Sequence, residues 1–344
     1  MSVAKFDEST VLRLVSELRD SLLTNSILKN VTHRQQSVEK AMLLLCSSLN
    51  KARLELSPPT WAGLLKKLSD HPVKQLLLLD PFTKRVHDKP RGYAGDAKML
   101  DYLYFNPEDA NVQPIGADVQ RFLCGSPAGR AVRERAMIMG ELIDRMAQRL
   151  QSDRKLRVLS VACGHARELF LSESFLQHKV CFTGLDADVK SLQTMNHSFG
   201  GFDVTALPWP VKKILNRDHE LLSRGQYDLV YSCGLFDYLN DQTGSKLTET
   251  MFNDLVRPGG KLIIANFMDH FIRGYMEAFM NWNLIYRDTF ELSNMAKNLA
   301  SDCKAVHLFK DTSSFLAFLE IDKILVNDNA VELFKQPSKL TAKL

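Results

Sequence analysis

The sequence predicts an α/β protein in which a seven-stranded, mostly parallel sheet ends in an antiparallel hairpin and follows an all-helical region. Two observations predict this class. Residues 1–150 repeat their apolar side chains every three or four positions, as amphipathic helices do. From residue 156 onward, short β-branched runs alternate with helical segments, a pattern typical of parallel sheets with crossover helices. We therefore expect a helical domain over 1–150, a sheet domain over 153–325 and a C-terminal tail over 326–344.

The composition is that of a globular protein and excludes several other classes. The chain has 344 residues, enough for about two domains of roughly 150 residues each. Hydrophobic residues make up 45% and charged residues 24%, which excludes a disordered chain, a collagen and a coiled-coil rod. The formal net charge of +4 is too small to indicate a nucleic-acid partner, because proteins that track phosphates concentrate basic charge on one face.

The cysteines and the apolar runs indicate a reducing, cytoplasmic location. The six cysteines are irregularly spaced and lack a C-x-x-C pair, unlike the dense cysteines of a disulfide scaffold. Asp7 and Glu8 interrupt the apolar stretch that a signal peptide would need. No window approaches roughly 18 uninterrupted apolar residues, so we expect no membrane insertion. With neither an H-E-x-x-H motif nor a Cys/His cluster of metal-binding spacing, we expect no metal site.

Helices in the first 150 residues are marked by periodicity and by turn residues. One apolar repeat covers residues 11–22 and a second covers residues 38–52. The Ser-Pro-Pro-Thr segment at 57–60 ends the second helix, and its threonine can cap a third helix that begins at Trp61. A further helix is expected over residues 130–150.

Residues 88–96 break the helical pattern. Two glycines, one proline, two basic and two acidic residues fall within this short segment, so we predict a structured loop. The loop is either an ordinary connection between helices or a segment that reaches over a neighbouring site. Its composition is compatible with both interpretations.

Seven short apolar runs in the second half of the chain are expected to form the strands. Only residues 310–314 separate the last two runs, which is too short for a parallel crossover. These two runs must therefore pair as an antiparallel hairpin. The predicted strands lie at residues 157–162, 180–185, 204–207, 227–233, 261–265, 306–309 and 315–319.

Small residues follow the first predicted strand, in the turn that opens the next helix. Ala162, Gly164 and Ala166 leave room for a ligand to approach the strand end, where the free N–H groups of a helix start also lie. Open α/β sheets bind their ligands at this edge. The alternative is a tight strand-to-helix turn without a ligand.

Asp186 ends the second predicted strand, 22 residues after Gly164. An acid at about this spacing is placed to accept hydrogen bonds from ribose hydroxyls, although it could instead cap the next helix. A dinucleotide would need glycines beside its pyrophosphate, whereas S-adenosylmethionine has no phosphate and tolerates the alanines. We therefore favour S-adenosylmethionine as the cofactor. The expected contacts are Ala162, Cys163, Gly164, Ala166, Asp186 and Ala187.

Several segments together resemble the motifs of class I S-adenosylmethionine-dependent methyltransferases. The resemblance rests on residues 158–166, Asp186, residues 227–239 and residues 255–266. It implies a Rossmann-like, seven-stranded methyltransferase sheet with one strand inserted antiparallel. It also implies that the end of the fourth strand faces the methionine part of the cofactor. The residues placed there are Ser232 and Gly234.

A narrower resemblance concerns the methyl acceptor. Residues 89–96, 231–239 and 282–287 are similar to bacterial methyltransferases of the PhcB-like group. That group makes 3-hydroxypalmitic acid methyl ester signals, which implies carboxyl O-methylation of a hydroxylated fatty acid. A small-molecule acceptor of this kind needs an apolar cavity, and the helical domain would serve as its lid.

The expected reaction places few demands on acid–base chemistry. A carboxylate is already ionised at neutral pH and needs no general base. Catalysis would rest on holding its oxygen in line with the sulfonium carbon and on excluding water. We expect Arg91 or Arg287 to fix the carboxylate by paired hydrogen bonds and Tyr93 to form a wall. The resemblance adds Tyr286 to these catalytic candidates.

Two other functions stay open on the sequence alone. An O- or N-methyltransferase of another metabolite would need a base, for which Tyr93, His165 and Asp96 are candidates. A non-catalytic protein that binds S-adenosylmethionine as a regulatory signal would use the helical region to dock a partner. The sequence also leaves a homodimer open.

Overall fold

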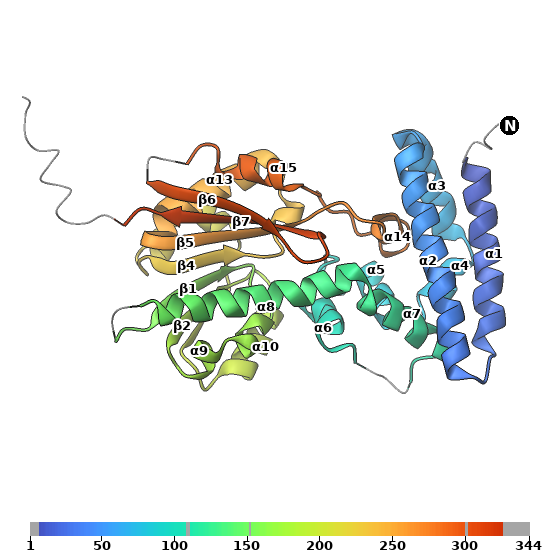
Figure 1. Ribbon diagram of the computed structural model, residues 1–344, viewed down its shortest axis with the longest axis horizontal. Helices are drawn as coiled ribbons and strands as arrows, with labels where there is room; N and C mark the ends of the chain where they lie inside the picture. Colours follow the sequence, from blue (N-terminus) through green and yellow to red (C-terminus); the bar gives the residue numbers. More distant parts are fainter. Residues whose placement is uncertain (1–6, 108–110, 151–152, 300–301, 326–344) are drawn as a thin grey trace, which may run out of the picture.

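A helical region stands at one end of the computed structural model and a sheet region at the other (Figure 1). The structure describes residues 7–107, 111–150, 153–299 and 302–325. The tail expected at 326–344 therefore lies outside the described residues. Within the described part of the chain, no helix is long and apolar enough to cross a membrane.

Eight helices precede the sheet in the described part of the chain, as the apolar periodicity predicts. Ser57 caps the third helix by accepting the Thr60 N–H, and this helix begins at Pro58. The start expected at Trp61 is corrected, because proline fits the first turn of a helix, where its missing N–H is not needed. The helices are α1 (Glu8–Ser26), α2 (Val31–Glu55), α3 (Pro58–Asp70), α4 (Val73–Leu77), α5 (Pro81–Asp88), α6 (Ala97–Phe105), α7 (Pro114–Gly125) and α8 (Pro127–Gln148).

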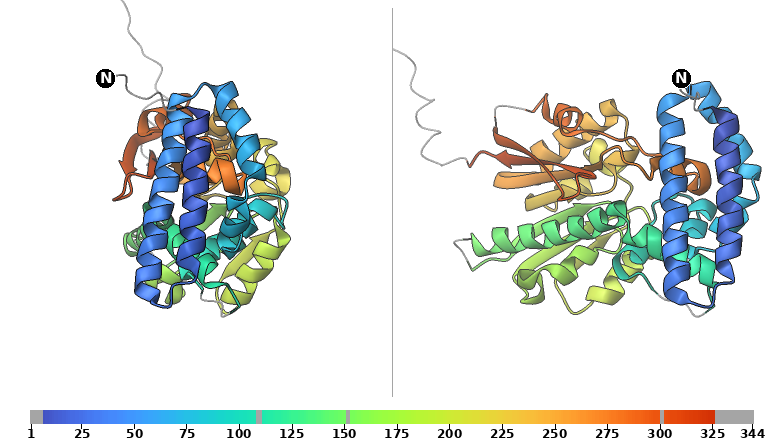
Figure 2. Two further views of the ribbon diagram at one scale, coloured as in Figure 1. Left: turned by 90° about the vertical axis from the view of Figure 1, so that its right-hand side faces the viewer. Right: turned by 45° about the vertical axis from the view of Figure 1, so that its right-hand side comes forward.

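The last of these helices, α8, covers the sheet although it precedes the boundary expected near residue 150. It runs along the sheet region and packs against the first strand and α9 (Glu173–Leu176) (Figure 1, Figure 2). Its buried side includes Val132, Met139 and Leu142, which belong to the same apolar core as strand residues. The first 150 residues therefore supply both the helical region and part of the cover of the sheet.

Seven strands form one sheet in the order β3-β2-β1-β4-β5-β7-β6. The first five strands are parallel to one another, and β7 pairs antiparallel with both β5 and β6. The predicted parallel sheet and its terminal antiparallel hairpin are thus confirmed. The strands are β1 (Leu156–Val161), β2 (Val180–Leu185), β3 (Val204–Leu207), β4 (Tyr227–Ser232), β5 (Val256–Phe267), β6 (Cys303–Lys310) and β7 (Leu316–Lys323).

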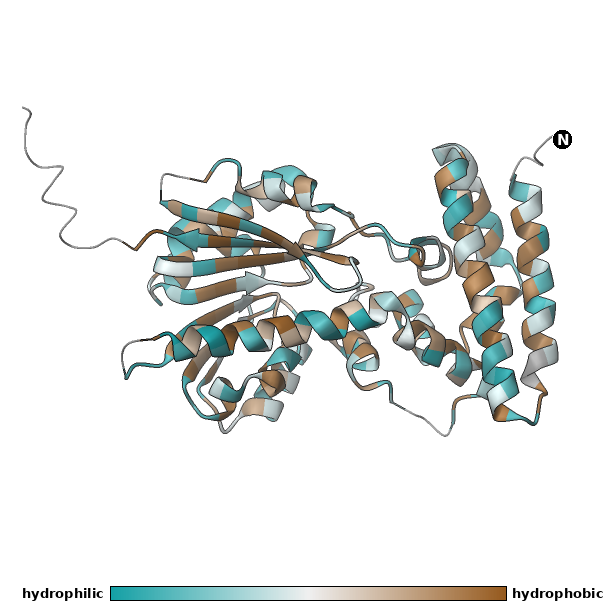
Figure 3. Cartoon of the chain, viewed as in Figure 1, coloured by the Kyte–Doolittle hydropathy of each residue, from teal (hydrophilic) through white to brown (hydrophobic). Residues whose placement is uncertain are grey.

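The sheet separates two apolar cores. Along β1, Val158 belongs to one core and Leu159 to the other, as the alternation of side chains in a strand requires. The first core joins α8 and α10 with the helical region, and α13 covers the second. Figure 3 shows hydrophobic residues along the central strands. The remaining helices of the sheet region are α10 (Val189–Phe199), α11 (Lys212–Leu215), α12 (His219–Leu222), α13 (Asp241–Thr250), α14 (Arg273–Tyr275) and α15 (Thr289–Ser293).

The segment between β5 and α15 leaves the sheet and returns to the helical region. Its short helix α14 lies beside α2 (Figure 1). A Cβ at Gly274 would lie 2.7 Å from the Leu49 carbonyl carbon, so this close approach requires glycine. The Trp61 indole N–H also donates to the Glu277 carboxylate at 2.8 Å. This segment therefore joins the two ends of the molecule.

Replacing Leu142 with alanine tests the packing of α8. Leu142 is 5% exposed, so Leu142→Ala should lower the free energy of unfolding by about 2–5 kcal/mol through the cavity that it leaves. Met137 on the same helix is 53% exposed, and Met137→Ala should change the free energy of unfolding by less than about 0.5 kcal/mol. Denaturant unfolding measures both values. Equal losses would contradict the burial of this side of α8.

Candidate active site

A cavity of about 440 Å³ opens at the carboxyl edge of the sheet, where β1, β2 and β4 end. The volume lies in the range of small-molecule sites. Its walls come from the turn after β1, the residues after β2 and β4, and parts of α6 and α8. Most of the residues predicted to hold a cofactor line this cavity. They are Ala162, Cys163, Gly164, Asp186, Ala187 and Gly234.

Asp186 is fixed by the turn after β1. One carboxylate oxygen accepts the Gly164 N–H and the other accepts the Asp188 N–H, each at 2.8 Å. Each oxygen keeps a further lone pair for a ribose hydroxyl. Burial raises the pKa of Asp186, and these two hydrogen bonds oppose that rise. Gly164 has a φ of 56°, and a Cβ there would lie 3.0 Å from the Ala97 Cβ, so the turn requires glycine.

Two of the predicted cofactor residues lie behind the cavity wall. Ala166 is buried, with a φ of 50°, and begins the short helical segment that follows the turn. Ser232 is fully buried, and its hydroxyl donates to the Val161 carbonyl oxygen at 3.0 Å. Ser232 therefore ties β4 to β1. Neither residue lines the cavity, and the direct cofactor contact expected of both stays a prediction.

The buried carboxylate of Asp101 ties α6 to the turn after β1. Arg167 donates to both of its oxygens at 2.9 and 3.2 Å, and the His165 Nδ1 lies 3.1 Å from it. Burial alone would raise the pKa of Asp101, but the hydrogen bonds from His165 and Arg167 lower it to about 2. The ionised carboxylate therefore stabilises the fold above pH of about 4 and loses this contribution as the pH falls toward 2. The α6 residues that line the cavity are Ala97, Leu100 and Tyr104.

The loop at residues 89–96 closes the cavity on the side of Asp188. Arg91 donates to the Asp188 carboxylate at 2.7 Å and to the Ser191 hydroxyl at 2.8 Å. The Tyr93 hydroxyl donates to the same carboxylate at 3.4 Å, and Tyr93 lines the cavity whereas Arg91 does not. Asp188 also caps α10, so these contacts fasten the loop to the sheet region. Arg91 is paired with Asp188 and lines neither cavity, so its acceptor role stays a prediction.

The cavity wall also carries a buried carboxyl group and a buried guanidinium group. Tyr231 donates to Glu168 at 2.5 Å, and burial raises the pKa of Glu168. Arg135 of α8 is 5% exposed and hydrogen-bonds the Tyr104 hydroxyl. Because a guanidinium is always protonated in proteins, Arg135 places a fixed positive charge in the wall.

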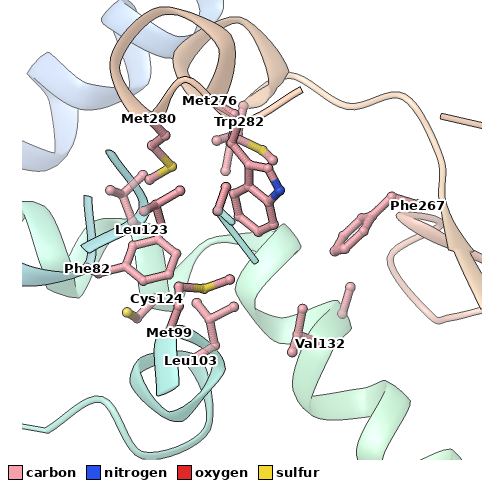
Figure 4. Packing of buried hydrophobic residues seen from close by; sticks show 14 of the residues in the cluster. Phe82, Met99, Leu103, Leu123, Cys124, Val132, Phe267, Met276, Met280 and Trp282 are labelled. Atoms are coloured by element: carbon pink, nitrogen blue, oxygen red, sulfur yellow. The ribbon is translucent and has the colours of Figure 1, made fainter. Parts of the chain in front are cut away.

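A second, apolar cavity adjoins the first, between the helical region and the segment after β5. Figure 4 shows its side chains pointing toward one another from several helices and from the segment that carries Met276 and Trp282. It is the smaller of the two cavities, with about 70 Å³. Its apolar lining includes Phe82, Met99, Leu123, Phe267, Met276 and Trp282.

The two cavities meet at a junction built from three distant segments. A Cβ at Gly95 would overlap the Tyr238 hydroxyl, so the loop approaches this closely only with glycine. The same hydroxyl accepts the Trp282 indole N–H at 2.8 Å. The three segments of the narrower resemblance therefore contact one another here. The residues that line both cavities are Gly95, Leu100, Arg135, Gly234 and Tyr238.

Arg287 and Tyr286 support the apolar cavity from behind its wall. Arg287 is 3% exposed and makes five hydrogen bonds within the protein, which occupy all five of its donors. It therefore has no donor left for an acceptor carboxylate. Tyr286 packs against His270 and lines neither cavity. The catalytic roles of both residues stay predictions that these contacts do not favour. The partners of Arg287 are Asp241, Asn266 and the carbonyl oxygens of Phe236 and Leu239.

Sequence reasoning missed three polar residues that line the apolar cavity, Arg135, Asp237 and His270. Arg135 could have been found from the sequence, because it is a charged residue on the side of α8 that the helical period predicts to be apolar. Val132 and Met139 lie on the same buried side. Asp237 is 3% exposed, and burial raises its pKa to about 6. His270 follows β5 without a distinctive pattern, and only the folded chain brings it to the cavity.

Comparison with known proteins bears on the fold. Residues 59–180 match a sequence family described as "Putative methyltransferase". A "possible exported protein" from Bordetella parapertussis is 17% identical, with a TM-score of 0.55, over 92% of this chain and 97% of that chain. The carbon methyltransferase CurJ is 11% identical over 92% of each chain at a TM-score of 0.49. The N-methyltransferase NodS from Bradyrhizobium japonicum is 14% identical at a TM-score of 0.39, over 58% of this chain and 88% of that chain. No curated protein matches the chain.

The sheet order, the inserted β7 and the likeness to the Bordetella protein decide the architecture. The fold is that of the class I methyltransferases. Its carboxyl edge carries the cavity lined by Gly164 and Asp186, where the sequence places the cofactor. S-adenosylmethionine, the cofactor expected from the sequence, agrees with this methyltransferase fold and with the matched family.

Replacing Asp186 tests the cofactor cavity. Asp186→Ala should weaken S-adenosylmethionine binding by about 10- to 150-fold, because it removes a charged acceptor worth roughly 1.5–3 kcal/mol. Calorimetry gives the dissociation constant. Asp203→Ala is the control and should bind normally, since Asp203 pairs with Lys155 at the opposite end of the strands. Unchanged affinity in Asp186→Ala would remove this residue from the cofactor site.

Proposed function

We propose that the protein is an S-adenosylmethionine-dependent methyltransferase that methylates the carboxyl oxygen of a small apolar acid, with hydroxylated fatty acids as the substrate class. One observation carries the proposal. A polar cavity with the predicted cofactor residues adjoins a small apolar cavity, and the buried Arg135 lines both. A cofactor and an acid in these two places would meet beside a fixed positive charge. The helical region would then cover the acceptor.

The polar cavity suits S-adenosylmethionine. Asp186 keeps lone pairs for ribose hydroxyls, and the turn at Gly164 leaves backbone rather than side chain next to the ligand. Glu168 adds a carboxyl group to the same cavity, which favours a positively charged ligand. When bound, the cofactor supplies a methyl group on a sulfonium ion.

The residues of the chain would orient the acid and exclude water. Arg135 offers a planar pair of donors that matches a carboxylate. Apolar walls such as Phe82, Met99 and Trp282 would hold the hydrocarbon part. Alignment of this kind can lower the activation free energy by about 7–11 kcal/mol. The absence of water strengthens the attraction between the guanidinium and the carboxylate.

Arg135 takes the role expected of Arg91 or Arg287. It forms no salt bridge within the described part of the chain, its side chain hydrogen-bonds the Tyr104 phenol, and the buried carboxyl groups of Asp237 and Glu168 lie close enough to attract it. A buried charge is costly unless an opposite charge accompanies it. Asp237 and Glu168 partly balance this charge without pairing with it directly, and an anionic ligand at the junction would form that direct pair. This supports an acid as the acceptor.

Incubation with isotope-labelled S-adenosylmethionine tests the proposed reaction. The acceptors are straight-chain fatty acids, hydroxylated fatty acids, phenols and amines, and mass spectrometry identifies the products. We expect methyl esters of the acids. Transfer to phenols or amines alone would replace the proposed acceptor. Cofactor binding without transfer to any acceptor would favour a regulatory protein.

Arg135→Gln should lower kcat/KM for the acids by about 10- to 150-fold, because a hydrogen bond to a charged group is worth roughly 1.5–3 kcal/mol. Arg145→Gln is the matched control on the same helix, where Arg145 is exposed, and should leave the rate unchanged. Steady-state kinetics with a fixed acid gives both values. Equal rates in the two variants would remove Arg135 from the acceptor site.

A second candidate function is methylation of a hydroxyl or amine group on an apolar acceptor. Asp237 favours it, because this buried carboxyl group lines the apolar cavity and burial raises its pKa to about 6. At neutral pH such a group is ionised and able to accept a proton. A carboxylate acceptor would make no use of this capacity.

Asp237→Asn separates the two functions. If the acceptor is a carboxylate, kcat should stay within about threefold of the wild type, because no proton has to be removed. Loss of a general base would instead lower kcat by about 100- to 10,000-fold. Asp237 accepts the Phe267 N–H at 2.7 Å, and asparagine keeps an oxygen acceptor for this bond. Kinetics at neutral pH, together with the melting temperature, distinguishes these outcomes.

A further inference from the structure

His270 lies in the wall of the apolar cavity, shortly after the end of β5. It is 7% exposed, and neither of its ring nitrogens has a hydrogen-bond partner in the described part of the chain. Its ring stacks on Phe315 at 5.2 Å and stands edge-on to Phe267 and Tyr286 at 5.8 and 5.4 Å. Buried polar groups are normally paired, so this one requires an explanation.

The other polar side chains of the apolar cavity do have partners within the protein. Each of them forms a hydrogen bond that would survive without a ligand. His270 is therefore the exception among the described residues of this wall. The partners are Leu123 for Ser126, Tyr104 for Arg135, Phe267 for Asp237 and Trp282 for Tyr238.

We propose that His270 hydrogen-bonds a hydroxyl group carried within the apolar body of the acceptor. This inference rests on the proposed function, because it takes the apolar cavity as the acceptor site. A neutral imidazole presents one donor nitrogen and one acceptor nitrogen. It can therefore donate a hydrogen bond to a hydroxyl or accept one from it, so the hydroxyl of the ligand would have a hydrogen-bond partner. His270 would then determine specificity without taking part in the reaction.

The charge of the ring supports a neutral ligand group at this place. Burial lowers the pKa of His270 to about 4, so the ring is uncharged at neutral pH. The nearby charges are mixed, with Asp269 on one hand and Arg53 and Arg273 on the other. An uncharged ring surrounded by aromatic side chains has no preference for a second carboxylate. A hydroxyl matches both its hydrogen-bonding capacity and its neutrality.

The position of His270 separates this contact from the reacting group. Arg135 and Tyr238 line both cavities, whereas His270 lines the apolar cavity alone. The hydroxyl that it binds therefore lies away from the junction where the methyl group would be transferred. An acceptor that satisfies both places carries an acid group at one point and a hydroxyl further along an apolar chain.

The test compares hexadecanoic acid with three hydroxylated forms, which carry the hydroxyl next to the carboxyl group, one carbon further, or at the chain end. The wild type should favour one hydroxylated form over the plain acid by at least about tenfold in kcat/KM. His270→Phe keeps the ring shape and should reduce this preference to within about twofold, and the readout is the ratio of the two kcat/KM values within each variant. His270→Gln, which restores a donor and an acceptor, should recover part of the preference.

Controls and a second readout keep the result specific. His307→Phe, on the exposed surface of β6, should keep the full preference. Equal wild-type rates on all four acids, or a preference that persists in His270→Phe, would overturn the role of His270 and leave the proposed function standing. If no acid is methylated, the proposed function fails. The melting temperature with S-adenosylhomocysteine and each acid then tests the role of His270. A larger rise with a hydroxylated acid than with the plain acid, lost in His270→Phe, upholds this role. Equal rises in melting temperature with all the acids overturn it.

Discussion

The pairing of the Asp101 carboxylate with Arg167 and His165 fixes α6, and both cavities depend on the position of that helix. A buried carboxylate must be paired, so the cofactor turn and the helical region are held together by the same charge. Leu100 of α6 lines both cavities. A change in the angle of α6 would therefore alter both cavities at once, which couples them physically.

Neither half of the chain completes a cavity alone. The sheet region supplies the turn, Asp186 and the loop after β4, whereas the first 150 residues supply Tyr93, Ala97 and Arg135. The segment after β5 crosses in the other direction and carries Trp282 and His270 into the apolar cavity. Because each half of the chain lines both cavities, the apolar cavity lies beside the polar one. The exclusion of water from them would strengthen the contacts that orient an acid.

Local patterns predicted the parts of the fold that depend on near neighbours in the chain. Short β-branched runs between helical segments located β2 and β3. The short connection before β7 required the antiparallel hairpin. The spacing from Gly164 to Asp186 identified two residues of the cofactor cavity. Roles set by distant contacts were not accessible in this way. Arg287 is a plausible carboxylate binder by residue type, and only its five hydrogen bonds to four residues of other segments show that its donors are occupied.

The proposed function requires the acid group of the acceptor to lie against Arg135 at the junction of the two cavities. The decisive measurement is a crystal structure of the protein with S-adenosylhomocysteine and a long-chain fatty acid. We expect the carboxylate within hydrogen-bond distance of the Arg135 guanidinium and the hydrocarbon chain between Met99 and Trp282. An acid bound outside the apolar cavity, or inside it with its carboxylate away from Arg135, would contradict the account.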